Sequence, residues 1–335
     1  MEIISGKIVK QDGHLLFFSD GSHIICNEYG NQVIKVFKIK GWKYSFVSRL
    51  GILRRFFRAE VTGLYMMIDG NEVLIAKKNL FSRLTTDISF TKSFDIPRGS
   101  KPLNICITPS GCIYFGEYFQ NKNKQAVNIY RSEDNAKTWH IVYTFKEGNI
   151  NHIHGLFYDP YTNRIWVTTG DRDNECIIGY TENEFKTFTG VFRGGQDYRT
   201  CQLFFYKDFI VFGTDSQYQQ NVIKKFDRQS LEITELQVVQ GSVIKGGQVG
   251  EVAFISTTVE PSDVNTDNWA HLWVTKDGLH WEEKFKAKKD RLPATLFQFG
   301  TFEFPQYYGI KKLKRLYFSG RALKGLDGKT SYIDL

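Results

Sequence analysis

The chain has 335 residues, of which 15% are aromatic, including 28 Phe and 17 Tyr, and it contains 29 Gly. Long alanine-rich amphipathic stretches are missing, so the composition argues against a helical fold and favours strands joined by tight turns. The formal net charge of +8 is spread along the chain without a nucleic-acid-binding motif. A solvated surface explains most of this charge; the sharper interpretation is a preference for anionic ligands, including acidic glycans, and nucleic acid is less favoured than either.

The N-terminal stretch MEIISGKIVKQDGHLLFF lacks the features of a secretory signal, and no apolar run is long enough to span a bilayer. We therefore expect a cytoplasmic protein without a membrane span. The five cysteines are an odd number without CxxC spacing, and several sit in strand-like runs such as NICITPSGCIYF. We interpret them as buried, reduced thiols rather than as disulfides or zinc ligands.

In chain order, residues 2–9 predict a spare N-terminal strand, and strand-rich units follow. The last unit supplies only three strands, TLFQFGTFEFP, KRLYFSGRAL and KTSYIDL. We expect the N-terminal strand to pair at about 329–335, which completes the last unit and joins the two ends of the chain. The units lie at about 11–50, 55–97, 101–147, 150–194, 197–240, 243–286 and 291–335.

One turn recurs in four of these units. The stretch IYRSEDNAKTWHIVYTF turns at Ser132, and LWVTKDGLHWEEKF turns at Thr275. Weaker copies turn at Thr181 and Asp227, so the steps between the turns are 49, 46 and 48 residues. A period in the forties built from short strands is typical of β-propeller blades. The sequence therefore predicts an all-β, seven-bladed β-propeller with four-stranded antiparallel blades, formed as one domain by residues 1–335.

The residues of the turn explain its role. An Asp two positions after Ser or Thr can accept N–H groups of its own loop, a Gly permits positive φ, and an aromatic residue packs beneath the turn. In the first copy Asp134 and Trp139 take two of these roles, and Ala136 stands in the Gly position. The pattern S/T-x-D-x-G-x-x-W resembles the Asp-box of BNR repeats, the motif of sialidase-type β-propellers.

A second resemblance covers residues 110–216, which are similar to uncharacterised Asp-box proteins of bacterial surface-polysaccharide loci. It implies a carbohydrate context. The Arg-Ile-Pro motif of sialidases is absent from the N-terminal region, and FDIPRG at 94–99 lies in the wrong blade. An arginine triad with a Tyr–Glu pair cannot be assigned either, which argues against sialidase activity itself.

Propeller geometry predicts where a site should lie. The Asp-box turns join third to fourth strands, so the loops after second strands and the links between blades gather on the opposite face. Polar residues in those loops of blades three to five predict one pocket near the ring axis. Asp173 and Glu175 are interpreted as solvated loop charges. The candidate catalytic residues are Glu117, His152, His154, Asp171 and Asp215, and the candidates for substrate binding are Tyr118, Gln196, Tyr198, Arg199 and Arg58.

Two classes of function fit these residues. A glycoside hydrolase would use two carboxylates, Glu117 with Asp171 or Asp215, as acid and as nucleophile or base. A polysaccharide lyase would use His or Tyr as base, while Arg199 or a His-held metal neutralises the substrate carboxylate. The alternative is a non-catalytic propeller that binds a glycan or holds partners in polysaccharide assembly. The sequence requires no cofactor and is compatible with a divalent metal at the histidines.

Overall fold

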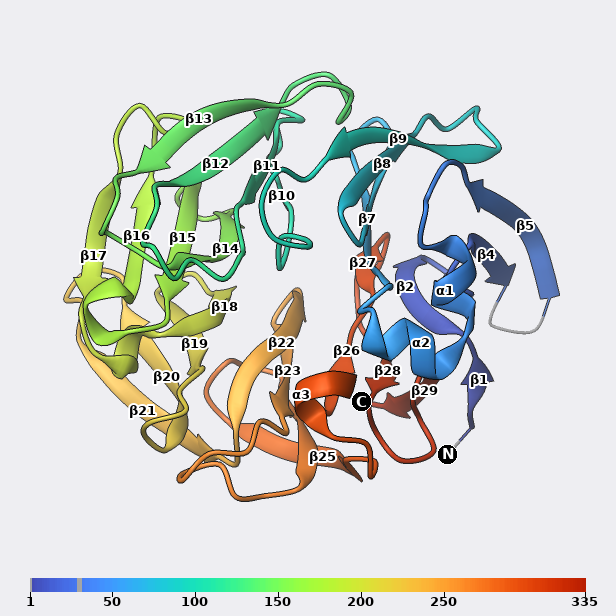
Figure 1. The fold of residues 1–335 in the computed structure, drawn as a ribbon. Helices are drawn as coiled ribbons and strands as arrows, with labels where there is room; N and C mark the ends of the chain where they lie inside the picture. Colours follow the sequence, from blue (N-terminus) through green and yellow to red (C-terminus); the bar gives the residue numbers. More distant parts are fainter. Residues whose placement is uncertain (1, 29–31) are drawn as a thin grey trace.

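The structure is a computed structural model that describes residues 2–28 and 32–335. Its strands form antiparallel sheets that stand in a ring, each with one edge toward the ring axis (Figure 1). Helices are few and short. The chain is therefore an all-β propeller, as the composition and the repeat predict.

The blades follow one another in chain order. The first contains β2 (Lys7–Asp12), β3 (Leu15–Ser19), β4 (His23–Glu28) and β5 (Gln32–Ile39), and the second contains β6 (Val61–Met66), β7 (Glu72–Ala76), β8 (Asn79–Arg83) and β9 (Ser89–Asp95). The third contains β10 (Cys106–Ile107), β11 (Ile113–Gly116), β12 (Val127–Ser132) and β13 (His140–Phe145). The fourth contains β14 (His152–Asp159), β15 (Arg164–Gly170), β16 (Ile177–Thr181) and β17 (Thr189–Arg193).

The fifth blade contains β18 (Thr200–Phe205), β19 (Phe209–Thr214), β20 (Asn221–Asp227) and β21 (Ile233–Val239), and the sixth contains β22 (Ser242–Val249), β23 (Val252–Thr258), β24 (Trp269–Thr275) and β25 (Trp281–Lys288). The last contains β26 (Thr301–Glu303), β28 (Arg315–Arg321), β29 (Lys329–Asp334) and β1 (Ile4–Ser5). The described residues thus form seven four-stranded units, although the first two join through a short parallel pairing of β5 with β9. The loop between β4 and β5, within the predicted unit 11–50, includes residues outside the described ranges.

The ends of the chain close the ring, with a correction to the predicted strand. The expected strand over 2–9 divides at Gly6, whose φ of 94° turns the chain. Before this turn β1 pairs with β29, and after it β2 opens the first blade, which therefore begins at residue 7 rather than 11. An additional strand, β27 (Gln306–Tyr308), pairs in parallel with β2. Closure is thus made at the outer edge of the last blade and again at the inner edge of the first.

Burial follows from the position of each strand in its blade. The second strand β15, with the sequence RIWVTTG, is buried at six of its seven positions because neighbouring blades cover both of its faces. The outer strand β13 is buried at one of its six positions because it lies at the rim. One apolar cluster joins Ile129 and Phe145 of blade three to Ile153 and Val167 of blade four. The core therefore lies between blades. All five cysteines are buried and unpaired, as predicted.

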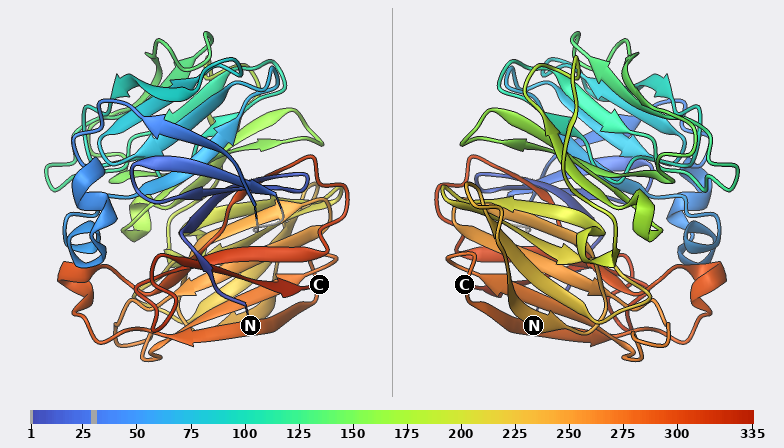
Figure 2. Two further views of the ribbon diagram at one scale, coloured as in Figure 1. Left: turned by 90° about the vertical axis from the view of Figure 1, so that its right-hand side faces the viewer. Right: turned by 90° about the vertical axis from the view of Figure 1, so that its left-hand side faces the viewer.

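Short helices occur in the links and loops of one face. They are α1 (Ser45–Arg49), α2 (Gly51–Phe56) and α3 (Ala294–Phe297), with the 3-10 helices η1 (Asp173–Glu175) and η2 (Gln196–Tyr198). The three α-helices project from the same side of the ring (Figure 2). Arg55 of α2 pairs with Asp290 and donates to the Phe297 carbonyl oxygen at 2.8 Å. In the part of the chain that the structure describes, every helix is too short or too polar to cross a membrane.

The recurring turns lie on the other face. They connect β12 to β13, β16 to β17, β20 to β21 and β24 to β25, which are third and fourth strands as predicted. In blade four, Thr181 at the turn pairs with Ile165, whereas His152 pairs with Gly170 at the opposite end of the sheet. The candidate catalytic residues of this blade are therefore on the face away from the turns.

The turns make the interactions that their residues predict. Asp134 Oδ1 accepts the N–H groups of Lys137 and Thr138 at 3.1 and 2.9 Å, and Trp139 Nε1 donates to the Ala136 carbonyl oxygen at 3.2 Å. Ala136, in the Gly position, adopts a φ of 62°. Burial alone would raise the pKa of Asp134, but hydrogen bonds from Thr138 outweigh it and lower the pKa.

Candidate functional site

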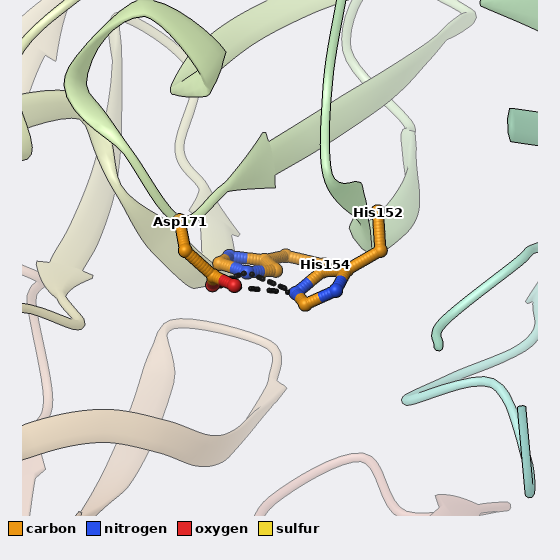
Figure 3. A group of neighbouring side chains, drawn as sticks. All are labelled: His152, His154 and Asp171. Atoms are coloured by element: carbon orange, nitrogen blue, oxygen red, sulfur yellow. Dashed lines mark hydrogen bonds and ion pairs between the residues drawn. The ribbon is translucent and has the colours of Figure 1, made fainter. Parts of the chain in front are cut away.

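Two histidines and an aspartate meet at the face opposite the turns. His152 and His154 lie at the start of β14, and Asp171 directly follows β15, the strand that pairs with it. The side chains point toward one another (Figure 3). Asp171 Oδ1 is 3.3 Å from the Nε2 atoms of both histidines, and the two Nε2 atoms are 3.2 Å apart. We call these three residues the His–Asp cluster.

Backbone carbonyls fix both imidazole rings. His152 Nδ1 is 3.0 Å from the Phe119 carbonyl oxygen, and His154 Nδ1 is 3.1 Å from that of Thr200. A carbonyl oxygen only accepts, so Nδ1 of each ring carries the hydrogen. In the neutral form of each ring, Nε2 is then an acceptor that faces the Asp171 carboxylate.

Gly170 makes room for this packing. A Cβ atom at this position would lie 2.4 Å from His154 Cε1 and 3.3 Å from Arg199 Cγ. On the other side of the carboxylate, Asn151 Nδ2 donates to Asp171 Oδ2 at 2.7 Å. Asp171 is thus held at both oxygens, while a third of its side chain remains exposed to solvent.

Arg199 connects this cluster to a second carboxylate. Its NH2 group is 3.1 Å from Asp171 Oδ1, and its Nε atom is 3.6 Å from Asp215 Oδ2. Asp215 also accepts the Cys201 thiol at 3.4 Å. Burial disfavours the Arg199 charge, but Asp215 and then Asp171 outweigh it and hold its pKa above the usual range. The guanidinium that was predicted to clamp a ligand is turned onto two carboxylates of the protein.

The electrostatics of the neighbourhood favour an ionised Asp171. Burial would raise the pKa of Asp171, but the imidazoles of His152 and His154, which donate to its carboxylate when they are protonated, outweigh it and hold the pKa well below its usual range. Burial is the main reason why the pKa of the Tyr118 hydroxyl is raised, and nearby acidic groups, including Asp171, add to it. The Tyr118 ring lies 4.2 Å from the His152 ring. Tyr118 therefore forms one wall of the cluster.

Glu260 belongs to the same neighbourhood and was missed in the sequence. Burial raises its pKa to about 7, and the Asp215 charge acts in the same direction. It lies two residues beyond β23, the second strand of blade six, in the loop that corresponds to those of Asp171 and Asp215, which directly follow their second strands. This shared loop was the signal that could have identified it.

Other candidates have structural partners instead. Glu117 forms an ion pair with Arg98 and accepts the Asn128 N–H at 2.8 Å, and its side chain is 1% exposed. Gln196 donates to the Asp171 carbonyl oxygen at 2.9 Å and orders the loop. Tyr198 stacks on Phe192 with ring centres 5.2 Å apart.

Arg58 and Glu175 lie in surroundings that differ from those expected. Arg58, two residues beyond the end of α2, is exposed. Among the described residues 2–28 and 32–335, it makes no contact with the His–Asp cluster. The prediction for Glu175 was wrong. It was expected to be a solvated loop charge, but the residue is buried and only 2% exposed. Its carboxylate pairs with Lys124 and accepts the Arg172 N–H at 3.1 Å, because the loop after β15 folds back over it.

Two open cavities lie along the loop after β11, and one of them reaches the cluster at Asp171. One, of about 320 Å³, is lined by nine residues that include Asp171 and the exposed Tyr218. The other, of about 490 Å³, shares Gln120, Asn121 and Lys122 with it. We call the pair the amide groove. Its amide side chains are Gln120, Asn121, Asn123, Gln125 and Asn151, and its cations are Arg98, Lys122, Lys124 and Arg172.

The amide groove was not predicted. Its signal was the run FQNKNKQ at 119–125, in which amides and lysines alternate directly after Tyr118. Loops on a rigid scaffold commonly carry binding residues, and amides match sugar hydroxyl groups because they both donate and accept.

The comparisons with known proteins support the fold. No family model and no curated protein matches the sequence. Among solved structures, a chain of the nidogen/laminin complex has a TM-score of 0.54 at 12% identity, covering 89% of this chain and 99% of that one. A GH74 enzyme of Niastella koreensis has a TM-score of 0.55 at 13% identity, covering 84% of this chain and 45% of that one.

A chain of the mitotic checkpoint complex gives a TM-score of 0.59 at 8% identity, covering 99% of this chain and 89% of that one. At such identities the likeness concerns architecture alone. The class of protein is therefore an all-β propeller.

Proposed function

We propose that this propeller acts on an acidic glycan that lies in the amide groove, with the reacting sugar beside the His–Asp cluster. The observation that carries the proposal is the continuity of the two: Asp171 lines the same cavity as Asn151, Lys122 and Arg172. Amides suit hydroxyl groups and cations suit sugar carboxylates. The resemblance to Asp-box proteins of polysaccharide loci points to the same substrate class.

Among reactions, elimination fits the groups better than hydrolysis. A hydrolase needs two carboxylates that face the scissile bond. Glu117 is engaged by Arg98, and Asp215 is 4% exposed, so Asp171 is the one candidate of the three that the solvent reaches readily. The hydrolase pairings predicted from the sequence are therefore not assembled in an open site.

In the proposed lyase reaction, a base removes the proton at C5 of a uronic acid unit. The electron pair of this C–H bond forms the C4–C5 double bond, the C4–O bond breaks, and the departing oxygen takes up a proton. Tyr118, beside His152, keeps its hydroxyl proton because burial raises its pKa, so in this proposal it is the acid that protonates the departing oxygen. Lys122 and Arg172 hold the glycan through its carboxylates.

The test is incubation of the full chain with acidic and neutral oligosaccharides. We expect unsaturated products, followed by ultraviolet absorbance, from uronic acid oligomers only. Tyr118→Phe should abolish turnover while retaining binding, and Arg172→Ala should weaken binding of acidic glycans. Lys137→Ala, which removes an exposed cation on the turn face, is the matched control. Equal binding of acidic glycans by Arg172→Ala and the unaltered chain would refute the placement of the groove.

A second function, glycan binding without catalysis, is favoured by one observation. His152 and His154 are 5% and 2% exposed, so a sugar reaches them only at their edges. Binding of acidic glycans without any turnover would select this function.

A further inference from the structure

We infer that the His–Asp cluster is a binding site for a divalent transition-metal ion, with His152 Nε2, His154 Nε2 and Asp171 Oδ1 as ligands. Three potential ligand atoms lie within 3.3 Å of one another. The inference deepens the proposed function, but it stands on the geometry of the cluster and can be tested without a glycan.

The hydrogen bonds of the two imidazole rings favour a cation in the cluster. Both Nδ1 atoms donate to backbone carbonyl oxygens, at 3.0 and 3.1 Å. With neutral rings, both Nε2 lone pairs and a carboxylate oxygen then face one another with no hydrogen between them. A cation relieves this repulsion. Metal-binding histidines typically donate their other ring N–H to a carbonyl or carboxylate, as both rings do here.

Asn151 does not alter this assignment. Its Nδ2 atom is 3.3 Å from His152 Nδ1, but it donates to Asp171 Oδ2 at the shorter distance of 2.7 Å. The Phe119 carbonyl oxygen, at 3.0 Å, remains the acceptor for His152 Nδ1–H. Asn151 thereby orients the carboxylate whose other oxygen faces the two imidazoles.

The spacing of the ligand atoms also suits a metal ion. A tetrahedral zinc ion with bonds of about 2.0–2.1 Å keeps its ligand atoms about 3.3–3.4 Å apart. The separations in the cluster are 3.2 and 3.3 Å. The rings are also held: side chains of His152 and His154 are 6% and 1% exposed, and Gly170 admits His154 at close range. A metal ion would therefore need little rearrangement.

The charge around the cluster and its access to solvent favour a cation as well. Arg199 contacts two carboxylates, Asp171 and Asp215, so the one positive charge leaves this group with a net negative charge. The cavity of about 320 Å³ that Asp171 lines leaves a side open for water or substrate oxygen. Two imidazoles and one carboxylate favour zinc, manganese or iron over magnesium and calcium, which prefer all-oxygen sites.

A neighbouring group is a poorer site. His154, Cys201 and Asp215 also lie close together. However, His154 Nδ1 donates to Thr200, and the Cys201 thiol donates to Asp215 at 3.4 Å. The Cys201 sulfur of this group therefore carries its hydrogen and is engaged with Asp215, whereas the ligand atoms of the His–Asp cluster face one another.

If the proposed function holds, the ion would neutralise the carboxylate of the bound uronic acid, the role predicted from the sequence for a His-held metal. The acidic sugar could then approach Asp171 without repulsion. Arg199, which is turned onto Asp171 and Asp215, would position the carboxylate ligand rather than contact the sugar.

The experiment is calorimetric titration of the metal-stripped full chain with Mn²⁺ and with Zn²⁺, using Mg²⁺ for comparison. We expect one Mn²⁺ or Zn²⁺ per chain and a higher Tm with the ion. Asp171→Asn and His152→Gln should each weaken binding beyond the about 10- to 100-fold that outer partners of a ligand typically contribute.

His271→Gln is the matched control. His271 is also buried between two carboxylates, Asp267 at 2.9 Å and Glu283 at 2.8 Å, but they contact different ring nitrogens. This variant should bind Mn²⁺ as the unaltered chain does. No binding of either ion by the unaltered chain, or equal affinity in a folded Asp171→Asn variant, would overturn the inference.

The outcomes separate the two proposals. Binding of metal without any response to acidic glycans would refute the proposed function and retain the metal site. Absence of Mn²⁺ and Zn²⁺ binding by the unaltered chain, together with glycan turnover by the metal-stripped protein, would refute the metal site and retain the proposed function.

Discussion

The Asp134→Ala variant tests the role of the recurring turn. Asp134 accepts four hydrogen bonds, from Ser132 Oγ at 3.0 Å, Lys137 N at 3.1 Å, Thr138 N at 2.9 Å and Thr138 Oγ1 at 2.7 Å. Each such bond contributes roughly 0.5–1.5 kcal/mol. The donors freed in this partly exposed turn are rehydrated, so we expect a total loss of about 1–2 kcal/mol in the free energy of unfolding.

The assay is urea unfolding followed by tryptophan fluorescence. The pKa of Asp134 is lowered in the folded state, so its contribution is present above the unfolded pKa and is lost as pH falls through the folded pKa. The difference between variant and unaltered chain should therefore shrink in acid. Mn²⁺ and glycan binding, on the other face, should not change.

The control is Glu133→Ala. Glu133 is the next residue, and its exposed carboxylate lies 2.6 Å from Arg131 NH2. Exposed ion pairs contribute about 0–1 kcal/mol, so this variant should be nearly neutral. Unchanged stability of Asp134→Ala together with loss of ligand binding would refute the structural role of the turn.

Three further predictions address closure, charge and the site. Removal of residues 2–5 should lower Tm in calorimetry, because it deletes β1 and the Ser331 hydroxyl bond to the Glu2 carbonyl oxygen. Burial lowers the pKa of Lys101 to about 7 in the folded state, whereas in the unfolded state it is about 10.4. Between these pH values the unfolded state binds one proton more than the folded state, so the free energy of unfolding rises with pH. Lys101→Met should remove this part of the pH dependence in urea titrations. Gly170→Ala should weaken Mn²⁺ binding in calorimetry by displacing His154, whereas Gly190→Ala, where the nearest atom is 3.7 Å from the new Cβ, should not.

The contrary results are equally specific. An unchanged Tm after truncation would show that β27 alone closes the ring. An identical pH slope for Lys101→Met would mean that Lys101 stays charged in the folded protein, where Glu60 and Glu303 favour its charge and Arg321 and Lys245 oppose it. Full Mn²⁺ affinity in Gly170→Ala would place the ion away from His154.

The fold was predictable because its signals are local. The hydrogen bonds of each turn join residues within four positions of one another, so the structure around Ser132 and Asp134 can be predicted from the neighbouring sequence alone. The closure at the N-terminus was predicted in outline, but the division at Gly6 and the added strand β27 depend on pairing across about 300 residues. The position of helix α2 depends on the ion pair of Arg55 with Asp290, and the sequence gives no sign that these two residues lie close together.

The residues of the site were predictable where they lie at the ends of strands, because strand ends can be recognised in the sequence. His152 and His154 are two apart and both face Asp171, although the pairing of β14 with β15 shifts between Ile153 and Gly155. Glu117 had the same loop position as Asp171, but its pairing with Arg98 cannot be inferred from spacing. Likewise, the direction of Arg199 depends on Asp215 in another loop.

The central claim is that the face opposite the turns binds an acidic glycan beside the His–Asp cluster. The most direct measurement is a crystal structure of the full chain soaked with a uronic acid oligosaccharide and Mn²⁺. The account predicts glycan density along the amide groove and an anomalous peak between His152, His154 and Asp171. Glycan density instead in the cavity of about 520 Å³ that the innermost strands of the blades line, beside Tyr161 and Gly250, would contradict it.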